Sequence, residues 1–168
     1  MTTTTVEPTQ LAQFLPRIYQ YTAEAYKTFQ KFAENLPNPM SAAMFKQFAE
    51  DEREIRDLID IKSAALPGVN VRATLGGDLG FQDMLEGELS YRESAEFLIA
   101  RERTLQKKLR EIINSSDALD RNLMIYIESM KKSHAVELER ELELIKLDSD
   151  WWKREDAQWR IVHGSAPK

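Results

Sequence analysis

The stretch from Met44 to Ile59, which reads MFKQFAEDEREIRDLI, decides the fold of this chain. Its apolar residues recur at steps of three and four, which is the spacing of one face of an α-helix. One acidic residue falls on that face, which consists of Met44, Phe48, Glu52, Ile55 and Ile59. Burying an isolated charge is strongly unfavourable, so such a residue needs a partner inside the protein. The stretch therefore predicts one helix of a bundle whose interior holds polar groups.

Three further segments have the same helical spacing. The three segments predict helices over about 9–35, 91–114 and 117–147. The stretch quoted above belongs to a fourth helix, which we expect to run from Asn38 or Ser41 to Ala65. In the first, Pro16 predicts either a kink or a late helix start, because proline has no amide hydrogen to donate. Ser90 and Glu93 have the spacing of a capping box and mark the start of the third helix.

The connections indicate how these helices are arranged. A glycine-rich stretch over 67–80 is too long for a tight turn and predicts a crossover along a bundle, with a short helix over 81–88. A final short helix is expected over about 151–162. The sequence thus predicts a single all-α domain over 1–168. Its four-helix bundle, about 9–147, consists of two antiparallel helical hairpins joined by the long crossover.

The two predicted hairpins repeat each other in pattern. With an offset of 79 or 80 residues, the aligned inner-face pairs are Thr22 with Glu102, Glu52 with Lys131, and Ile55 with His134. The flanking apolar positions also agree in character. The repeat favours a bundle closed by two hairpins of similar construction.

The composition limits the functions that the chain can have. Of its 168 residues, 30% are charged and 42% hydrophobic, which is typical of a water-soluble globular domain. The net charge of -5 argues against nucleic acid as a partner, because phosphate binding requires clustered positive charge. The absence of cysteine excludes disulfides and thiolate metal sites. No apolar run approaches the ~20 residues of a membrane span and the N-terminus lacks a signal-peptide pattern, so we expect a cytoplasmic protein without a membrane partner.

Three more ionisable residues lie on predicted inner faces. Glu102 falls within an apolar stripe of the third helix, and Lys131 and His134 fall on the stripe of the fourth. A core histidine and a lysine that extends to the surface are the plain structural alternatives. A carboxylate among aliphatic residues is uncommon unless it is paired. We therefore expect these side chains to face one another, or a bound cation.

The segments that carry these residues resemble the rubrerythrin branch of the ferritin-like superfamily. Residues 44–59 are similar to its second helix, in which a phenylalanine, an Ala-Glu step and a Glu-x-x-His motif follow in this order. Residues 98–109 and 124–138 resemble its third and fourth helices. The resemblance covers about 11–147 and implies a ferritin-like four-helix bundle. It also implies oxidoreductase or iron-handling relatives that commonly associate as dimers or larger assemblies.

The resemblance further implies six metal-ligand positions, one glutamate from each of two helices and a Glu-x-x-His from each of the other two. In this sequence the positions are Thr22, Glu52, Ile55, Glu102, Lys131 and His134. The ligand type is kept at Glu52, Glu102 and His134 and is lost at Thr22, Ile55 and Lys131. The implied di-metal site is therefore degenerate.

Lys131 stands where the family has a bridging glutamate. An ammonium group repels a metal cation and at the same time neutralises carboxylates. We therefore predict a metal-free buried network in which Glu52 pairs with Lys131 and Glu102 pairs with His134. Glu24, a substitute ligand on the first helix, lies on a face that we interpret as solvated.

Two functions from different classes fit this pattern. The first is a non-enzymatic bundle, without a cofactor, that acts in association or ligand binding. The alternative is an oxidoreductase with one iron or manganese ion held by Glu52, Glu102 and His134, a set that leaves coordination positions open. A full di-metal site would need substitute ligands.

The resemblance makes a homo-oligomer, most simply a dimer, the expected assembly. Three tryptophans near the C-terminus have two interpretations. Trp151, Trp152 and Trp159 either form the contact between copies or pack across the end of their own bundle. The packing interpretation is the simpler one.

Overall fold

The computed structural model describes residues 6–66, 70–71, 81, 84, 87–115 and 118–157. These residues contain four long helices and no strand, which confirms the all-α prediction. The helices are α1 (Val6–Asn35), α2 (Pro39–Ala64), α4 (Tyr91–Ser115) and α5 (Ala118–Leu147), and a short 3₁₀ turn, η1 (Trp151–Lys153), follows them. In this part of the chain, none of the helices combines the length and the apolar character needed to cross a membrane.

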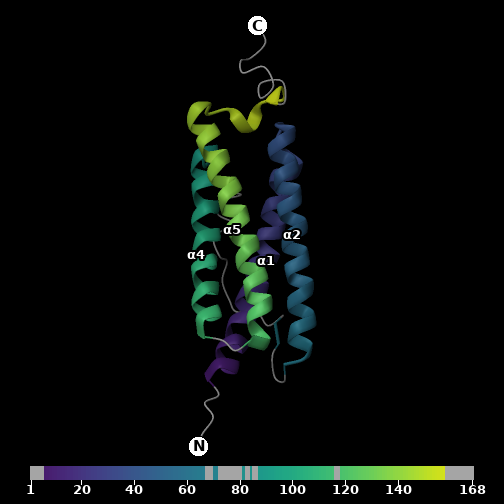
Figure 1. Cartoon of the computed structure of the whole chain (residues 1–168). Coiled ribbons are helices and arrows are strands. Elements are labelled where there is room, and N and C mark those ends of the chain that lie inside the picture. Colours follow the sequence, from purple (N-terminus) through teal and green to yellow (C-terminus); the bar gives the residue numbers. More distant parts are fainter. Residues whose placement is uncertain are drawn as a thin grey trace, which may run out of the picture.

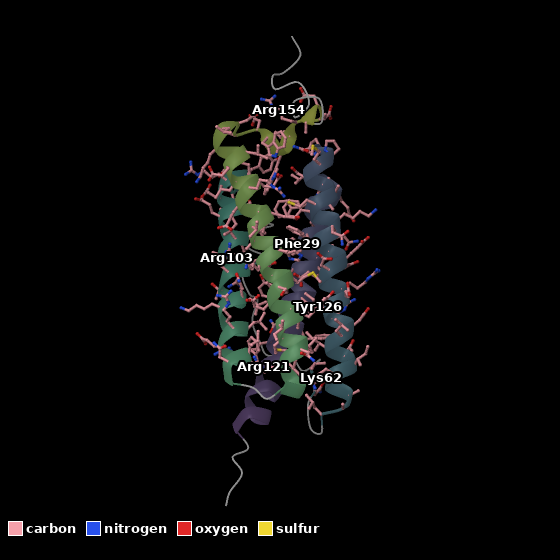
Figure 2. The ribbon with its side chains drawn as sticks, in the orientation of Figure 1. Phe29, Lys62, Arg103, Arg121, Tyr126 and Arg154 are labelled. Atoms are coloured by element: carbon pink, nitrogen blue, oxygen red, sulfur yellow. The ribbon has the colours of Figure 1, made fainter. Side chains whose placement is uncertain are left out.

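The four helices lie side by side as an elongated bundle (Figure 1). The most extensive contacts are those between α1 and α2 and between α4 and α5, whereas α2 with α5 and α1 with α4 touch at fewer places. Only residues 36–38 separate α1 from α2. Side chains with nitrogen and oxygen tips project from both sides of the bundle (Figure 2). The chain therefore buries its apolar stripes in the interior and keeps most of its charges outside.

The helix starts follow from local hydrogen bonds. At α2, the side chain of Asn38 accepts from the amides of Met40 and Ser41 at 3.0 and 3.1 Å. At α4, the predicted capping box is confirmed, since Ser90 Oγ accepts from the Glu93 amide and Glu93 Oε1 from the Ser90 amide, both at 3.1 Å. Each cap satisfies amides that have no partner within the helix.

The first helix begins earlier than predicted, at Val6, and Pro16 lies inside it. The late start suggested by this proline is therefore wrong. A proline costs its helix one backbone hydrogen bond. Burial of the adjacent Leu15 and Ile18 in the core offsets that loss.

Aromatic rings close the end of the bundle that lies near the α1–α2 turn. The Phe32 and Phe45 rings stack with their centroids 4.8 Å apart, and the Trp152 ring meets Phe45 edge-on at 5.4 Å. Trp151 and Trp152 are buried within their own chain, which confirms the packing interpretation for both residues. Trp159 lies outside the described residues.

The predicted helix over 151–162 is wrong in its first part. It begins as the three-residue turn η1 and is interrupted at Arg154, whose backbone is extended with φ -75° and ψ 108°. The reason is a set of hydrogen bonds from Asn38, which is far away in the sequence. The Asn38 side-chain amide donates to the Trp151 carbonyl at 2.8 Å, and the Asn38 backbone amide donates to the Trp152 carbonyl at 3.1 Å. The Trp151 carbonyl also accepts from the Arg154 amide at 3.0 Å, so the bonds to Asn38 hold η1 as a single turn beside the start of α2.

The predicted crossover lies almost entirely outside the described residues, as does half of the short helix over 81–88. Of the residues of that stretch that are described, Phe81 and Met84 are buried in the core. The Phe81 ring meets the Tyr21 ring edge-on, with centroids 5.3 Å apart. The same ring meets Phe97 of α4 edge-on at 6.0 Å, so Phe81 contacts both α1 and α4.

Candidate functional site

Four ionisable side chains from three helices meet in the centre of the bundle. Glu52 lies on α2, Glu102 on α4, and Lys131 and His134 on α5. All four are buried, with no more than 1% of their surface exposed. Lys131 and His134 are three residues apart, so both project from the same side of α5. The structure thus brings together the residues for which the sequence predicts a buried polar network.

Lys131 lies between the two glutamates. Its Nζ atom donates to Glu52 Oε1 and lies 3.3 Å from Glu102 Oε1. The same ammonium faces the Tyr21 ring, 4.9 Å from its centroid, where the ring's electron density attracts a cation. Burial lowers the pKa of Lys131 well below its ordinary value, and the nearby Asp51 carboxylate opposes this shift. The contacts with Glu52 and Glu102 favour the charged form of Lys131, whereas burial disfavours it.

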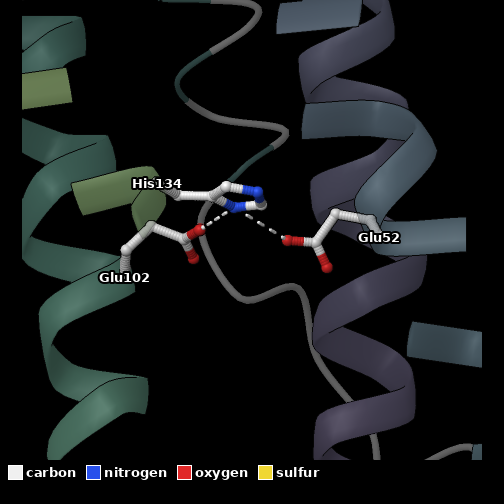
Figure 3. A group of neighbouring side chains, drawn as sticks. All are labelled: Glu52, Glu102 and His134. Atoms are coloured by element: carbon white, nitrogen blue, oxygen red, sulfur yellow. Dashed lines mark hydrogen bonds and ion pairs between the residues drawn. The ribbon is translucent and has the colours of Figure 1, made fainter. Parts of the chain in front are cut away.

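His134 bridges two carboxylates, those of Glu102 and Asp51. Its Nδ1 lies 2.8 Å from Glu102 Oε1 and 3.7 Å from Glu52 Oε1 (Figure 3). Its Nε2 lies 2.9 Å from Asp51 Oδ2. A neutral imidazole carries one N–H, and an ionised carboxylate can only accept. Both close hydrogen bonds therefore require the doubly protonated, positively charged ring.

Aromatic rings fix the orientation of His134. The Phe48 ring stacks on the imidazole with centroids 4.1 Å apart, and the Phe29 ring meets it edge-on at 5.9 Å. Phe48 precedes Glu52 by one turn on α2, and Phe29 belongs to α1. The cation therefore contacts aromatic faces as well as carboxylates, which is favourable for a protonated ring.

Tyr21 belongs to the network, although the sequence interpretation did not single it out. Its hydroxyl donates to Glu102 Oε2. Burial raises the pKa of Tyr21 well above its ordinary value, and the negative charge of Glu102 raises it further, so the phenol stays protonated as a donor. The sequence feature that points to Tyr21 is its position on the apolar stripe of α1, three residues after Ile18 and four before Ala25.

Asp51 is the second missed member. Its side chain is 16% exposed, and its Oδ1 accepts from Gln47 Nε2 at 2.9 Å. Burial raises the pKa of Asp51, but the hydrogen bonds from His134 and Gln47 and the charges of His134 and Lys131 outweigh this effect and lower it overall. Asp51 directly precedes Glu52 in the sequence, and it connects the buried centre to the surface of α2.

Two of the three positions that lost a ligand type, Thr22 and Ile55, contribute nothing to the polar centre. The Thr22 hydroxyl donates within α1 to the Tyr19 carbonyl at 2.8 Å, and Ile55 is part of the apolar core. Glu24 is half-buried and accepts from Gln20 on its own helix at 3.0 Å, which differs from the fully solvated face that the sequence predicts. Its carboxylate is thus engaged along α1.

A metal site can be tested against this geometry. Glu52, Glu102 and His134 each offer a ligand atom, and these atoms lie within 4.8 Å of one another. However, both Oε1 atoms contact the Lys131 ammonium, and His134 Nδ1 carries a proton toward Glu102. A histidine ligand must be deprotonated, and a cation is repelled by an ammonium in its place. As arranged, these residues do not fit a metal ion of the ferritin-like type.

Comparison of the chain with models of protein families, with curated proteins and with solved structures finds no match. The resemblance to the rubrerythrin branch therefore stays a prediction from the residue pattern. What is known of the site comes from its own geometry.

Proposed function

We propose that this chain is a ferritin-like bundle in which the Lys131 ammonium has replaced the metal, and that it acts in association rather than in catalysis. The observation that carries this proposal is the position of Lys131 Nζ, in contact with Glu52 Oε1 and 3.3 Å from Glu102 Oε1. These are the carboxylates that a metal would bind in the family that the sequence resembles. In this proposal the chain needs no cofactor, because the Lys131 side chain supplies the cation.

The arrangement of the helices supports the ferritin-like part of the proposal. The contacts are concentrated in the pairs α1–α2 and α4–α5, as expected for two antiparallel hairpins. The short link of residues 36–38 joins the first pair, and the long connection before α4 joins the pairs. Such a connection has the length that a crossover requires.

The chemistry of the centre supports a structural role. Two buried carboxylates and two buried cations contact one another, and aromatic rings surround the histidine. Within the described residues, Glu52 Oε2 is the one carboxylate oxygen of this centre that has no hydrogen-bond partner. Removing one partner of a buried ion pair is strongly destabilising even when the pair itself adds little stability. A network of this kind persists as a unit and fixes the relative positions of α2, α4 and α5 without any reaction.

One observation favours a second candidate function, a mononuclear iron or manganese oxidoreductase. The ligand atoms of Glu52, Glu102 and His134 lie within 4.8 Å of one another, which is close enough to surround one ion. This function requires Lys131 to turn away and His134 to lose its Nδ1 proton. Both changes leave charged groups without their present partners, so the metal-free arrangement is the better supported of the two.

The two functions differ in metal content. We would express the protein with added iron and manganese and measure bound metal per chain by mass spectrometry in the wild type, Lys131→Glu and Glu102→Ala. The proposal expects almost no metal in the wild type and new uptake in Lys131→Glu, which supplies a third carboxylate beside Glu52 and Glu102. Lys132→Glu is the matched control, because Lys132 is exposed and adjacent. About one metal per chain in the wild type, lost in Glu102→Ala, would instead establish the mononuclear site.

A further inference from the structure

Cationic side chains gather at one place on the surface that α4 and α5 share. A depression with a volume of about 280 Å³ lies there, and we call it the basic depression. It is lined by Arg103, Gln106, Lys107 and Arg110 of α4 and by Lys132 of α5. Among the described residues no carboxylate belongs to this lining, although the chain as a whole has a net charge of -5. The local charge is therefore opposite to that of the chain, which favours an anionic ligand.

The two arginines of the basic depression are oriented by glutamates of α5. Arg103 Nη2 donates to Glu139 Oε1 at 2.5 Å, and Arg110 Nε donates to Glu128 Oε1 at 3.0 Å. On α5, Lys132 lies between these glutamates, about 6 Å along the helix from Glu128 and about 10 Å from Glu139 at ~1.5 Å per residue. The glutamates thus flank the depression instead of filling it. Within the described part of the chain, both Nη groups of Arg110 remain without an acceptor.

The two lysines of the basic depression are not neutralised. Lys107 and Lys132 are exposed, and neither forms an ion pair with another described residue. Because each arginine is matched by one glutamate, the two lysine charges remain as the net charge of this place. A single carboxylate would balance only one of them. A phosphate group carries about -1.5 to -2 charges at pH 7, so it balances both.

A buried amide with unused donors also lines the basic depression. Gln106 is only 7% exposed, and its Oε1 accepts from Arg103 Nη1 at 2.8 Å. A guanidinium can only donate, so this contact identifies the amide oxygen and leaves the two N–H groups of Nε2 on the other side. Among the described residues Nε2 has no hydrogen-bond partner, yet it is not one of the unpartnered atoms that are sealed from solvent. These N–H groups are therefore available to an oxygen atom in the depression.

We propose that the basic depression between α4 and α5 binds the phosphate group of a small molecule. Lys107 and Lys132 supply the charge, and Gln106 Nε2 and the Nη groups of Arg110 supply directed hydrogen bonds to the phosphate oxygens. The depression is slightly smaller than the ~300 Å³ at which pockets for drug-sized ligands begin, so the ligand is free phosphate or a compact phosphate monoester. The inference goes beyond the proposed function, because it concerns the outer surface of the bundle.

Isothermal titration calorimetry in phosphate-free buffer tests the site with inorganic phosphate and, separately, with glycerol 2-phosphate. We expect saturable binding that the dianion sulfate competes with and the monoanion acetate does not. Lys107→Ala and Lys132→Ala should each weaken it about tenfold, the effect of one charge-assisted hydrogen bond. Lys108→Ala is the matched control, because Lys108 is an exposed neighbour of Lys107 that does not line the depression. Tighter binding of glycerol 2-phosphate would identify an organic phosphate as the ligand, and equal binding would identify the phosphate group alone.

Gln106→Glu distinguishes a specific site from a general attraction of anions to surface cations. It keeps an oxygen for Arg103 but replaces the N–H donors with a charged acceptor, so phosphate binding should be lost while the helical circular dichroism spectrum is unchanged. Thr104→Glu adds the same charge at an exposed position of α4 outside the depression and should retain binding. Equal weakening by these two variants would overturn the proposal. So would the absence of saturable binding to the wild type, or wild-type affinity in both Lys107→Ala and Lys132→Ala.

The outcome is separable from that of the proposed function. Metal content reports the state of Lys131 and the buried centre, whereas phosphate binding reports the outer surface between α4 and α5. The metal measurement is made without phosphate, so Lys132→Glu remains a valid control there. A metal-containing wild type that binds phosphate would disprove only the metal-free centre. A metal-free wild type that does not bind phosphate would disprove only the phosphate site.

Discussion

Lys131 holds the charge balance of the buried centre. Its ammonium contacts Glu52 and lies 3.3 Å from Glu102, and all three side chains are fully buried. A metal ion in such a place can be lost to a chelator or replaced by another metal. An ammonium that is covalently attached to α5 cannot be exchanged, so the balance belongs to the chain itself. In the metal-free centre proposed above, one residue type at this position therefore separates a site that needs a metal from one that supplies its own cation.

Lys131→Met tests this role, because it keeps the length of the side chain and removes its charge. Glu52 and Glu102 would then be left with one fewer cation in a dry environment. We expect the free energy of unfolding to fall by about 3–5 kcal/mol, the range observed when one partner of a buried ion pair is removed. Urea denaturation followed by circular dichroism at pH 7 measures this change.

Lys132→Met is the control for this variant, because Lys132 is exposed and should change the stability by less than about 0.5 kcal/mol. The double variant Lys131→Met/Glu52→Gln should recover part of the loss, since it removes one of the unpaired carboxylates. Equal stability of the Lys131 and Lys132 variants would refute the charge balance described here.

The elements at the closed end of the bundle are joined through one carboxylate. Glu141 Oε1, on α5, accepts from the Ser41 hydroxyl of α2 at 2.5 Å and from the indole nitrogens of Trp151 and Trp152 at 3.2 and 3.1 Å. The backbone of Asn38 adds a further bond to the Trp152 carbonyl. Two helices and η1 therefore depend on the same oxygen atom.

Glu141→Ala should release this end of the bundle. Two indole N–H groups lose their acceptor, and each unsatisfied buried donor costs about 1–3 kcal/mol. We expect a loss of about 2–4 kcal/mol, less than the simple sum because water can enter this partly exposed end. The emission maximum of tryptophan should shift to longer wavelength in the folded state. Glu143→Ala, which changes an exposed residue of the same helix, should alter neither the stability nor the emission maximum.

At the element level, the sequence predicts helix boundaries that depend on neighbouring residues and misses those that depend on residues far away in the chain. The start of α4 follows from Ser90 and Glu93, three residues apart, and both cap bonds are present. The interrupted helix after Trp151 depends instead on Asn38, 113 residues away in the sequence. No periodicity near Trp151 contains that information.

The same distinction applies to the buried centre. The inner-face pattern identifies Glu52, Glu102, Lys131 and His134, because each interrupts an apolar stripe. Tyr21 and Asp51 were missed, because a tyrosine is ordinary on an apolar stripe and an aspartate is ordinary at the edge of one. Their roles depend on contacts with Glu102 of α4 and His134 of α5, which only the packing of the helices creates.

On the scale of the whole molecule, Asp51 connects the buried centre to the solvent. The centre itself is enclosed, but the Asp51 side chain is 16% exposed and accepts from His134 Nε2. This carboxylate is therefore a route by which protons in solution can reach the network. The acid stability of the entire bundle should then depend on one surface-accessible residue, because α2, α4 and α5 all contribute to the network.

The expected direction follows from the pKa of Asp51. In the folded chain this pKa lies below its ordinary value of 3.8, because the hydrogen bonds and charges of His134 and its neighbours outweigh the opposing effect of burial. Between the two pKa values the unfolded chain binds more protons than the folded chain, so the free energy of unfolding decreases as the pH falls. The stabilising contribution is complete above the unfolded pKa and is lost as the pH falls through the folded one.

Urea midpoints measured from pH 6 to pH 2 in the wild type and in Asp51→Asn test this dependence. The asparagine variant should be less stable at pH 6, because a neutral amide holds the His134 imidazolium less strongly than a carboxylate does. Its midpoint should then fall less steeply than that of the wild type below about pH 4, because the variant has no proton to gain at this position. Asp57→Asn, which changes an exposed aspartate of the same helix, should keep the wild-type profile. Parallel profiles for the wild type and Asp51→Asn would mean that Asp51 is not linked to the stability of the bundle, and the path from solvent to the buried centre would have to run through another residue.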